Sequence, residues 1–226
     1  MEWTKNYKKA ITFSYDDGIE MDLHLLEILN KYGLKATFNL NTGLDGTDDS
    51  WLFKDVEVKR LNLQQHAKAY QGHEIAVHTL THPNVCELSE KDFEHEVLGD
   101  RENIQKLFGQ NAVGFAYPYG TYSEEVMKKL KNYGFLYARG VQSCHSFDVQ
   151  SELLAFQPTC HHDDEQLFDL AERFLKMEPE QPQIFYIWGH SYEFEGNRNW
   201  DRFEEFCKLI SGKEDIFYGT NKEVLI

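Results

Sequence analysis

The chain of 226 residues carries 23 Lys and Arg against 38 Asp and Glu, a net charge of −15, and 41% of its residues are hydrophobic. A chain of this length can bury a sizeable core, so it needs neither disulfides nor a metal merely to fold. The acidity opposes nucleic acid and anionic membranes as partners. No segment approaches the roughly 18 consecutive apolar residues that a membrane-spanning helix requires.

The N-terminus and the cysteines indicate a cytoplasmic protein. Residues 1–7 lack the basic and then apolar profile of a signal peptide. The cysteines form no C-x-x-C pair and show no zinc-ribbon spacing. We therefore expect reduced thiols in a reducing compartment. The four cysteines are Cys86, Cys144, Cys160 and Cys207.

In the first half of the chain, short apolar runs that predict strands alternate with amphipathic stretches that predict helices. Ser89 is a good N-cap for the longest helix, with acidic residues in its first turn. A turn-rich segment at 42–50 predicts a loop. The expected strands are 10–15, 36–40 and 74–77, and the expected helices are 21–31, 54–70 and 89–108.

The second half continues the alternation. The expected strands are 112–116, 135–138, 153–156, 184–188 and 216–218, and the expected helices are 123–132, 164–177 and 200–210. Strand followed by helix, repeated this often, predicts a parallel sheet with helices outside it. Roughly seven or eight such units favour a barrel over an open sheet. We expect an α/β fold, a distorted or incomplete (β/α) barrel, TIM-like with about seven strands. With no linker and no repeat, residues 1–226 should be a single domain.

Three clusters of polar and aromatic residues follow predicted strands, whose C-terminal ends meet on the active-site face of a parallel barrel. The first cluster is F-S-Y-D-D-G at 13–18. Its adjacent carboxylates, Asp16 and Asp17, repel each other unless a cation or a proton lies between them. In isolation, a solvated turn explains this cluster equally well.

The second cluster is H-T-L-T-H-P at 78–83. His78 and His82 can reach one metal if the segment makes a helical turn, and imidazoles together with a carboxylate suit zinc-like ions. The spacing alone is weak, because the chain has ten histidines. The third cluster, F-A-Y-P-Y-G at 115–120, predicts a rigid turn that can aim backbone N–H groups outward.

Together these clusters resemble the first three motifs of the NodB-type polysaccharide deacetylases, carbohydrate esterase family 4. The family pattern is T-F-D-D-G, then H-[ST]-x-x-H-P, then R-x-P-[YF]-G. The later I-W-G-H at 187–190 resembles the strand with a terminal histidine that completes the set, so the likeness extends over about residues 10–190. It implies a NodB-homology deacetylase domain with one divalent metal ion, zinc being preferred.

The resemblance also implies residue roles. Asp17, His78 and His82 would bind the metal. Asp16 would be the general base, and His190 the general acid that protonates the leaving amine. The backbone N–H of Tyr119 would stabilise the oxyanion. The rings of Tyr117, Tyr119, Trp188 and Tyr192 could stack on a small carbohydrate or oligosaccharide substrate, although core packing is the commoner fate of such rings.

The chain departs from the family pattern at several positions. Ala116 replaces the Arg that opens the third motif. Arg139, at the end of the next strand, could supply a guanidinium to Asp16, or it could form a surface ion pair. No segment of the chain matches the fourth motif of the family. Glu193 could substitute for it, but we favour the interpretation of Glu193 as an exposed carboxylate. Gly189 replaces the usual apolar residue before the last histidine.

A further cluster, C-H-H-D-D at 160–164, is an alternative candidate for a metal site. Consecutive side chains diverge, so by itself it makes a poor site for one metal. Asp163 is expected to cap the helix that follows. Of the two histidines, His161 is the candidate for lining the pocket.

Three functions remain open from sequence. The leading one is metal-dependent removal of acetyl groups from an N-acetylated, or O-acetylated, carbohydrate. A second is hydrolysis of another small amide; metal-free relatives of that kind usually lack the Asp-His-His set. A third is a catalytically silent glycan-binding module, which the missing Arg supports and the retained base and acid oppose. The sequence leaves the oligomeric state undetermined.

Overall fold

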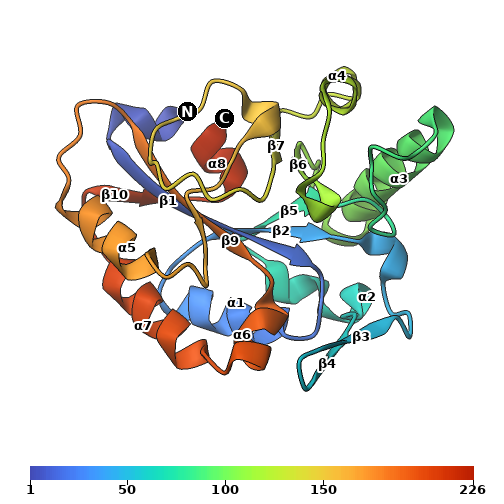
Figure 1. The fold of residues 1–226 in the computed structure, drawn as a ribbon, viewed down its shortest axis with the longest axis horizontal. Coiled ribbons are helices and arrows are strands. Elements are labelled where there is room, and N and C mark those ends of the chain that lie inside the picture. Colours follow the sequence, from blue (N-terminus) through green and yellow to red (C-terminus); the bar gives the residue numbers. More distant parts are fainter.

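A computed structural model describes all of residues 1–226 and confirms the incomplete barrel. Its parallel sheet has the strand order β7-β6-β5-β2-β1-β9-β8, and β10 pairs with the start of β1. The sheet curls around its centre without closing (Figure 1). The strands are β1 (Lys9–Asp17), β2 (Ala36–Leu40), β5 (Glu74–Val77), β6 (Gly114–Ala116), β7 (Tyr137–Arg139), β8 (Cys160–His161), β9 (Gln183–Gly189) and β10 (Ile216–Tyr218).

Helices cover the outside of the sheet, because their apolar faces and those of the strands bury one another. In Figure 1, α1, α5, α6 and α7 form one group, whereas α3 and α4 stand apart from them. The helices of these two groups are α1 (Asp22–Lys31), α3 (Glu90–Phe108), α4 (Glu124–Asn132), α5 (Leu167–Lys176), α6 (Ser191–Asn197) and α7 (Trp200–Ile210). Every residue of β1 is buried, as expected of a central parallel strand covered on both faces.

The end of the barrel at which the strands begin is filled by polar contacts with the short C-terminal helix α8 (Asn221–Leu225). The hydroxyl of Thr12 on β1 donates to Asn221, and the backbone N–H of Asn221 donates to Thr37 on β2. The Thr37 hydroxyl donates in turn to Glu74, at the start of β5. At the opposite end, where the strands stop, Asp16 and Asp17 of β1 and the residues that follow β5, β6 and β9 line a second face.

The predicted helix over 54–70 is largely wrong. Residues 50–59 form an antiparallel hairpin of β3 (Ser50–Phe53) and β4 (Val56–Lys59), which projects from the barrel in Figure 1. Along β4 the buried Val58 is flanked by two exposed residues, which is the period of a strand and not of a helix. Only α2 (Leu63–His66) and a 3-10 turn (Ala67–Tyr70) are helical in this segment.

Three predictions about element boundaries and helix caps can also be compared with the structure. The strand predicted at 153–156 is a 3-10 turn (Leu153–Ala155), whose start is capped by the Glu152 carboxylate. The helix expected from 164 begins at Leu167, and Asp163 does not cap it. Ser89 does cap α3, as predicted, by accepting from the N–H of Asp92. All four cysteines are free, and the structure contains no helix with both the length and the hydrophobicity needed to cross a membrane.

Candidate active site

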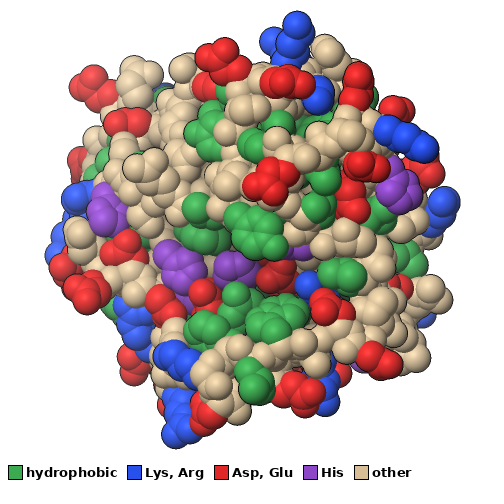
Figure 2. All heavy atoms as spheres, turned by 45° about the vertical axis from the view of Figure 1, so that its right-hand side comes forward, with side chains coloured by type: hydrophobic (Ala, Val, Ile, Leu, Met, Phe, Trp, Pro, Cys, Tyr) green, Lys and Arg blue, Asp and Glu red, His purple; other side chains and the backbone are tan.

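The C-terminal ends of the strands surround a cavity of about 610 Å³. Figure 2 looks onto this side of the molecule, where a band of histidine and acidic side chains is bordered by hydrophobic ones. The cavity gathers side chains from all four motif segments and from the β3–β4 hairpin. Its lining residues are Asp16, Asp17, Trp51, Arg60, His78, His82, Tyr117, Tyr119, Val141, Trp188, His190 and Tyr192.

Asp17, His78 and His82 lie together as expected. Oδ1 of Asp17 is 3.8 Å from Nε2 of His78 and 3.8 Å from Nε2 of His82. The helical turn expected between the two histidines is wrong, because Thr79 and His82 have positive φ of 68° and 61° and the segment is a loop. Asn41 fixes this loop by donating to the carbonyl of His78 at 2.6 Å.

The protonation pattern of these residues fits a divalent metal. Nδ1 of His78 lies 2.8 Å from the carbonyl oxygen of Ala116, so the ring donates there and Nε2 carries a free lone pair. That buried Nε2 has no hydrogen-bond partner in the protein. Burial lowers the pKa of His78, and it lowers the pKa of His82 to about 4, which keeps both imidazoles neutral. Two neutral imidazoles and a carboxylate are a zinc-type donor set.

The structure places Arg139 on Asp16. Nη2 of Arg139 lies 2.6 Å from Oδ1 of Asp16, and Asn39 donates to the same oxygen at 2.8 Å. Strand register explains the placement, because Arg139 on β7 pairs directly with Ala116 on β6. Burial by itself would raise the pKa of Asp16, but the charges of Arg139 and His190 bring it below its ordinary value. The carboxylate is therefore ionised and able to accept a proton.

His190 faces both aspartates from the end of β9. Its Nε2 lies 4.0 Å from Oδ2 of Asp16 and 3.9 Å from Oδ2 of Asp17. The interpretation of Glu193 as an exposed carboxylate is wrong, because its side chain is only 17% exposed and lies 3.3 Å from Nδ1 of His190. Burial alone would lower the pKa of His190, but Glu193 and the aspartates raise it to about 9. The imidazole is thus protonated at neutral pH.

The other predicted site residues divide into two groups. Tyr119 has a positive φ of 58°, and its ring lies 4.5 Å from that of His82, beside the metal triad. Tyr117 and Trp188 touch the cavity, but both are largely buried. His161 does not line the cavity; its Nε2 lies 3.0 Å from Glu193, behind His190.

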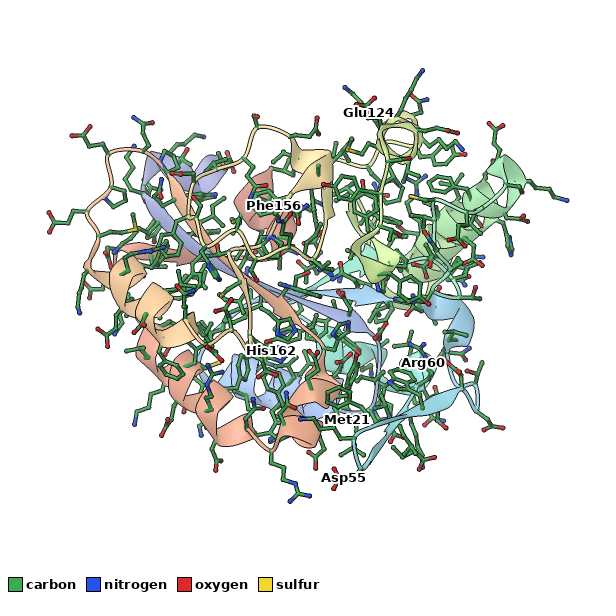
Figure 3. All side chains as sticks on the ribbon, viewed as in Figure 1. Met21, Asp55, Arg60, Glu124, Phe156 and His162 are labelled. Carbon is green, nitrogen blue, oxygen red and sulfur yellow. The ribbon has the colours of Figure 1, made fainter.

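Sequence reasoning missed two residues that hold the triad. Arg60 follows the β3–β4 hairpin, and Figure 3 shows it near the end of the barrel at which the strands stop. Its Nη1 donates to the backbone oxygen of Asp17 at 2.9 Å. Asp100 accepts from the backbone N–H of His78 at 3.0 Å. The helical pattern of the sequence could have revealed Asp100, because it shares the buried face of α3 with Val97 and Ile104. A carboxylate on such a face needs a hydrogen-bond partner.

We expect Arg60→Ala to weaken metal binding by about 10- to 100-fold, as loss of a residue that supports a ligand commonly does. Asp17 has a positive φ of 84°, which an Asp adopts only when its surroundings hold it there. Competition with a chromophoric chelator measures the affinity. Arg101→Ala is the matched control, because Arg101 also donates to a backbone oxygen, that of Tyr133, but does not line the cavity. Equal affinities in both variants would show that Arg60 does not position Asp17.

Comparisons with known proteins indicate the family to which this sequence is similar. The family model described as "Polysaccharide deacetylase" matches residues 4–138. A peptidoglycan-N-acetylglucosamine deacetylase of Bacillus cereus is 27% identical over 133 residues, which are 58% of this chain and 44% of that protein. A chitooligosaccharide deacetylase of Sinorhizobium fredii is 35% identical over 128 residues, 55% of this chain and 54% of that protein. The matched regions thus amount to about half the length of these relatives.

Solved structures show the same fold over nearly the whole chain. A family 4 carbohydrate esterase from Streptomyces lividans, in complex with acetate, superimposes with a TM-score of 0.58 at 16% identity and covers 94% of this chain and 93% of its own. The peptidoglycan N-acetylglucosamine deacetylase Bc1960 gives a TM-score of 0.60 at 18% identity, with coverage of 99% and 95%.

Proposed function

Because the chain belongs to the polysaccharide deacetylase family, we propose that it is a metal-dependent hydrolase that removes acetyl groups from an N-acetylated carbohydrate. The observation that carries this proposal is the pairing of Asp16 with Arg139 next to the Asp17–His78–His82 triad, with His190 facing both aspartates. A general base, a metal-ligand set and a general acid therefore line one cavity.

Asp17, His78 and His82 would hold one divalent ion, and their donor atoms favour zinc. When bound, such an ion polarises the acyl carbonyl and makes water more acidic. Asp16, which Arg139 keeps ionised, takes a proton from the attacking water. The backbone N–H of Tyr119 donates to the carbonyl oxygen as it gains charge. His190 gives its proton to the leaving nitrogen, and Glu193 orients the imidazole through Nδ1.

The cavity suits a small carbohydrate or oligosaccharide. Its volume of about 610 Å³ is within the usual range for small-molecule sites. Tyr119 lies at one wall with 66% of its surface exposed, whereas Trp51 and Tyr192 pack edge to face with ring centroids 5.6 Å apart. Such rings stack on the apolar faces of sugars. An uncharged N-acetyl sugar also suffers no repulsion from an acidic protein.

The alternatives have less support. The silent module rested on the missing third-motif Arg, but the Arg139 guanidinium lies beside Asp16 and supports a working general base. Hydrolysis of another small amide would use the same residues, so the choice of substrate needs experiment. Acetate release should be measured from a panel of N-acetylated and O-acetylated sugars. Release from none of them, with glycan binding intact, would favour the silent module.

We expect His82→Ala to lower metal content by about one ion per chain, and both this variant and chelation of the wild type to slow acetate release by about 100-fold or more. The physical reason is that two ligands cannot hold the ion as firmly as three. Elemental analysis and the acetate assay measure the two effects. His24→Ala is the control, because His24 is exposed on α1 and does not line the cavity. Full metal content in His82→Ala would remove His82 from the ligand set.

Two further proposals concern the chain as a whole. We propose that residues 1–226 act as one domain, because β1 pairs with β2 and also with β9 and β10 from the other end of the chain. Limited proteolysis should then yield no stable fragment. A cytoplasmic location, which reduced cysteines suit, is likewise a proposal that cell fractionation tests.

A further inference from the structure

Three histidines converge on the carboxylate of Glu193, behind the cavity. Oε2 of Glu193 lies 3.0 Å from Nε2 of His161 and 3.3 Å from Nδ1 of His190. The same oxygen is 3.5 Å from Nε2 of His162. The β8 end supplies His161 and His162, and the start of α6 supplies Glu193. Segments some 30 residues apart in the chain thus build one compact group of donors.

His162 is the unexplained member of this group. Figure 3 shows it in the interior of the molecule, where its ring stacks on Phe194 with centroids 4.0 Å apart. The ring is completely buried, and neither of its nitrogens has a hydrogen-bond partner in the protein. An unsatisfied buried polar group destabilises the fold. Something beyond the chain's own hydrogen bonds must therefore favour an imidazole at this position.

Gly189 shows that the imidazole has a dedicated space. A Cβ at residue 189 would collide with Nδ1 and Cε1 of the His162 ring. Any larger residue at 189 would thus displace the histidine, and an apolar side chain there could fill the same volume without burying a polar group. The combination of Gly189 and His162 gives a ring nitrogen a place near the Glu193 carboxylate instead.

We propose that His161, His190 and Glu193 form a second metal site, distinct from the Asp17 triad, that takes zinc with His162 as a further ligand. The donor atoms of His161, His190 and Glu193 all lie within 4.8 Å of one another. Ligand atoms around a tetrahedral zinc are about 3.3 Å apart. The 3.0–3.5 Å separations from Glu193 match that value more closely than the 3.8 Å separations in the first triad.

The second site is accessible to an ion and adjoins the proton donor. The side chains of His161, His190 and Glu193 are 23%, 20% and 17% exposed. Zinc held there would engage Nδ1 of His190 and the carboxylate that orients it. If the proposed function holds, zinc in the second site inhibits the enzyme. Turnover is then highest when only the first site is filled and falls as the second site fills. Zinc binding itself does not depend on that function.

Equilibrium dialysis against zinc chloride, followed by elemental analysis, tests the site without an activity assay. We expect two zinc ions per wild-type chain at saturation and one in either His161→Gln or Glu193→Gln. His82→Ala should retain the second-site ion. His145→Gln is the matched control: Nε2 of His145 pairs with Asp164 at 2.7 Å, outside the cluster, so this variant should bind two. Circular dichroism verifies that each variant is folded.

One zinc per wild-type chain at saturation, or two in folded His161→Gln, overturns the second site. The acetate assay separates the two proposals. If the wild type binds one zinc ion per chain and releases acetate at one equivalent of zinc, only the second-site proposal is wrong. Two bound ions without release at any zinc level mean that the deacetylase proposal is wrong. If both proposals hold, excess zinc slows the wild type, and His161→Gln needs at least about tenfold more zinc for the same inhibition.

Discussion

Asp16→Asn should reduce acetate release by about 10²–10⁴-fold while the metal stays bound. The amide has nearly the shape of the carboxylate but cannot accept a proton from water at neutral pH. Asp17, His78 and His82 are unchanged, so elemental analysis should still find the first-site ion. The test is kcat at saturating substrate together with metal content.

Asp201→Asn is the control for this substitution, because Asp201 is exposed in the first turn of α7 and does not line the cavity. It should leave both turnover and metal content unchanged. Near-normal acetate release by Asp16→Asn would show that another group takes the proton. Loss of metal in Asp16→Asn would instead make Asp16 a part of the ligand set.

Arg139→Ala should be the most destabilising of these substitutions. Arg139 is 1% exposed and Asp16 is 3% exposed, so the change leaves a buried carboxylate without its cation. Breaking one side of a buried ion pair costs about 3–5 kcal/mol. The variant should also lose turnover, because burial then raises the pKa of Asp16 without the opposing guanidinium. Urea denaturation and the acetate assay measure the two effects.

A double-mutant cycle isolates the ion pair. In the Asp16→Asn background the carboxylate charge is already gone, so adding Arg139→Ala should cost less than it does in the wild type. Arg139→Lys keeps the charge but loses the planar fork, and it should recover part of the stability. If Arg139→Ala costs the same in both backgrounds, its effect comes from lost packing over Trp188, whose ring lies 4.7 Å from the guanidinium.

The errors made from sequence have a common origin in long-range packing. The two strands of the hairpin at 50–59 pair with each other, and the hairpin packs on α6, with Phe53 lying where a Cβ of Gly196 would be. That contact joins residues more than 140 positions apart, and local periodicity cannot show it. Glu193 seemed a surface carboxylate for the same reason, since His161 reaches it from β8.

The sequence by itself determined the residues whose chemistry depends on short spacing. Adjacent carboxylates at a strand end and two histidines four residues apart indicated Asp16, Asp17, His78 and His82, and the resemblance to the last family motif added His190. Local sequence suffices there, because parallel strands must end on the same face. The alternation of strands and helices predicted the barrel for a similar reason, since each apolar face needs a covering layer.

Only the tertiary structure decided which supporting groups meet these residues. The register of β6 against β7 sets Arg139 beside Ala116, and the hairpin carries Arg60 to the backbone of Asp17. Glu193 reaches His190 through the start of α6, and Gly189 leaves the space that His162 fills. Strand register, hairpin docking and close packing arise from contacts between distant segments, so no local pattern in the sequence records them.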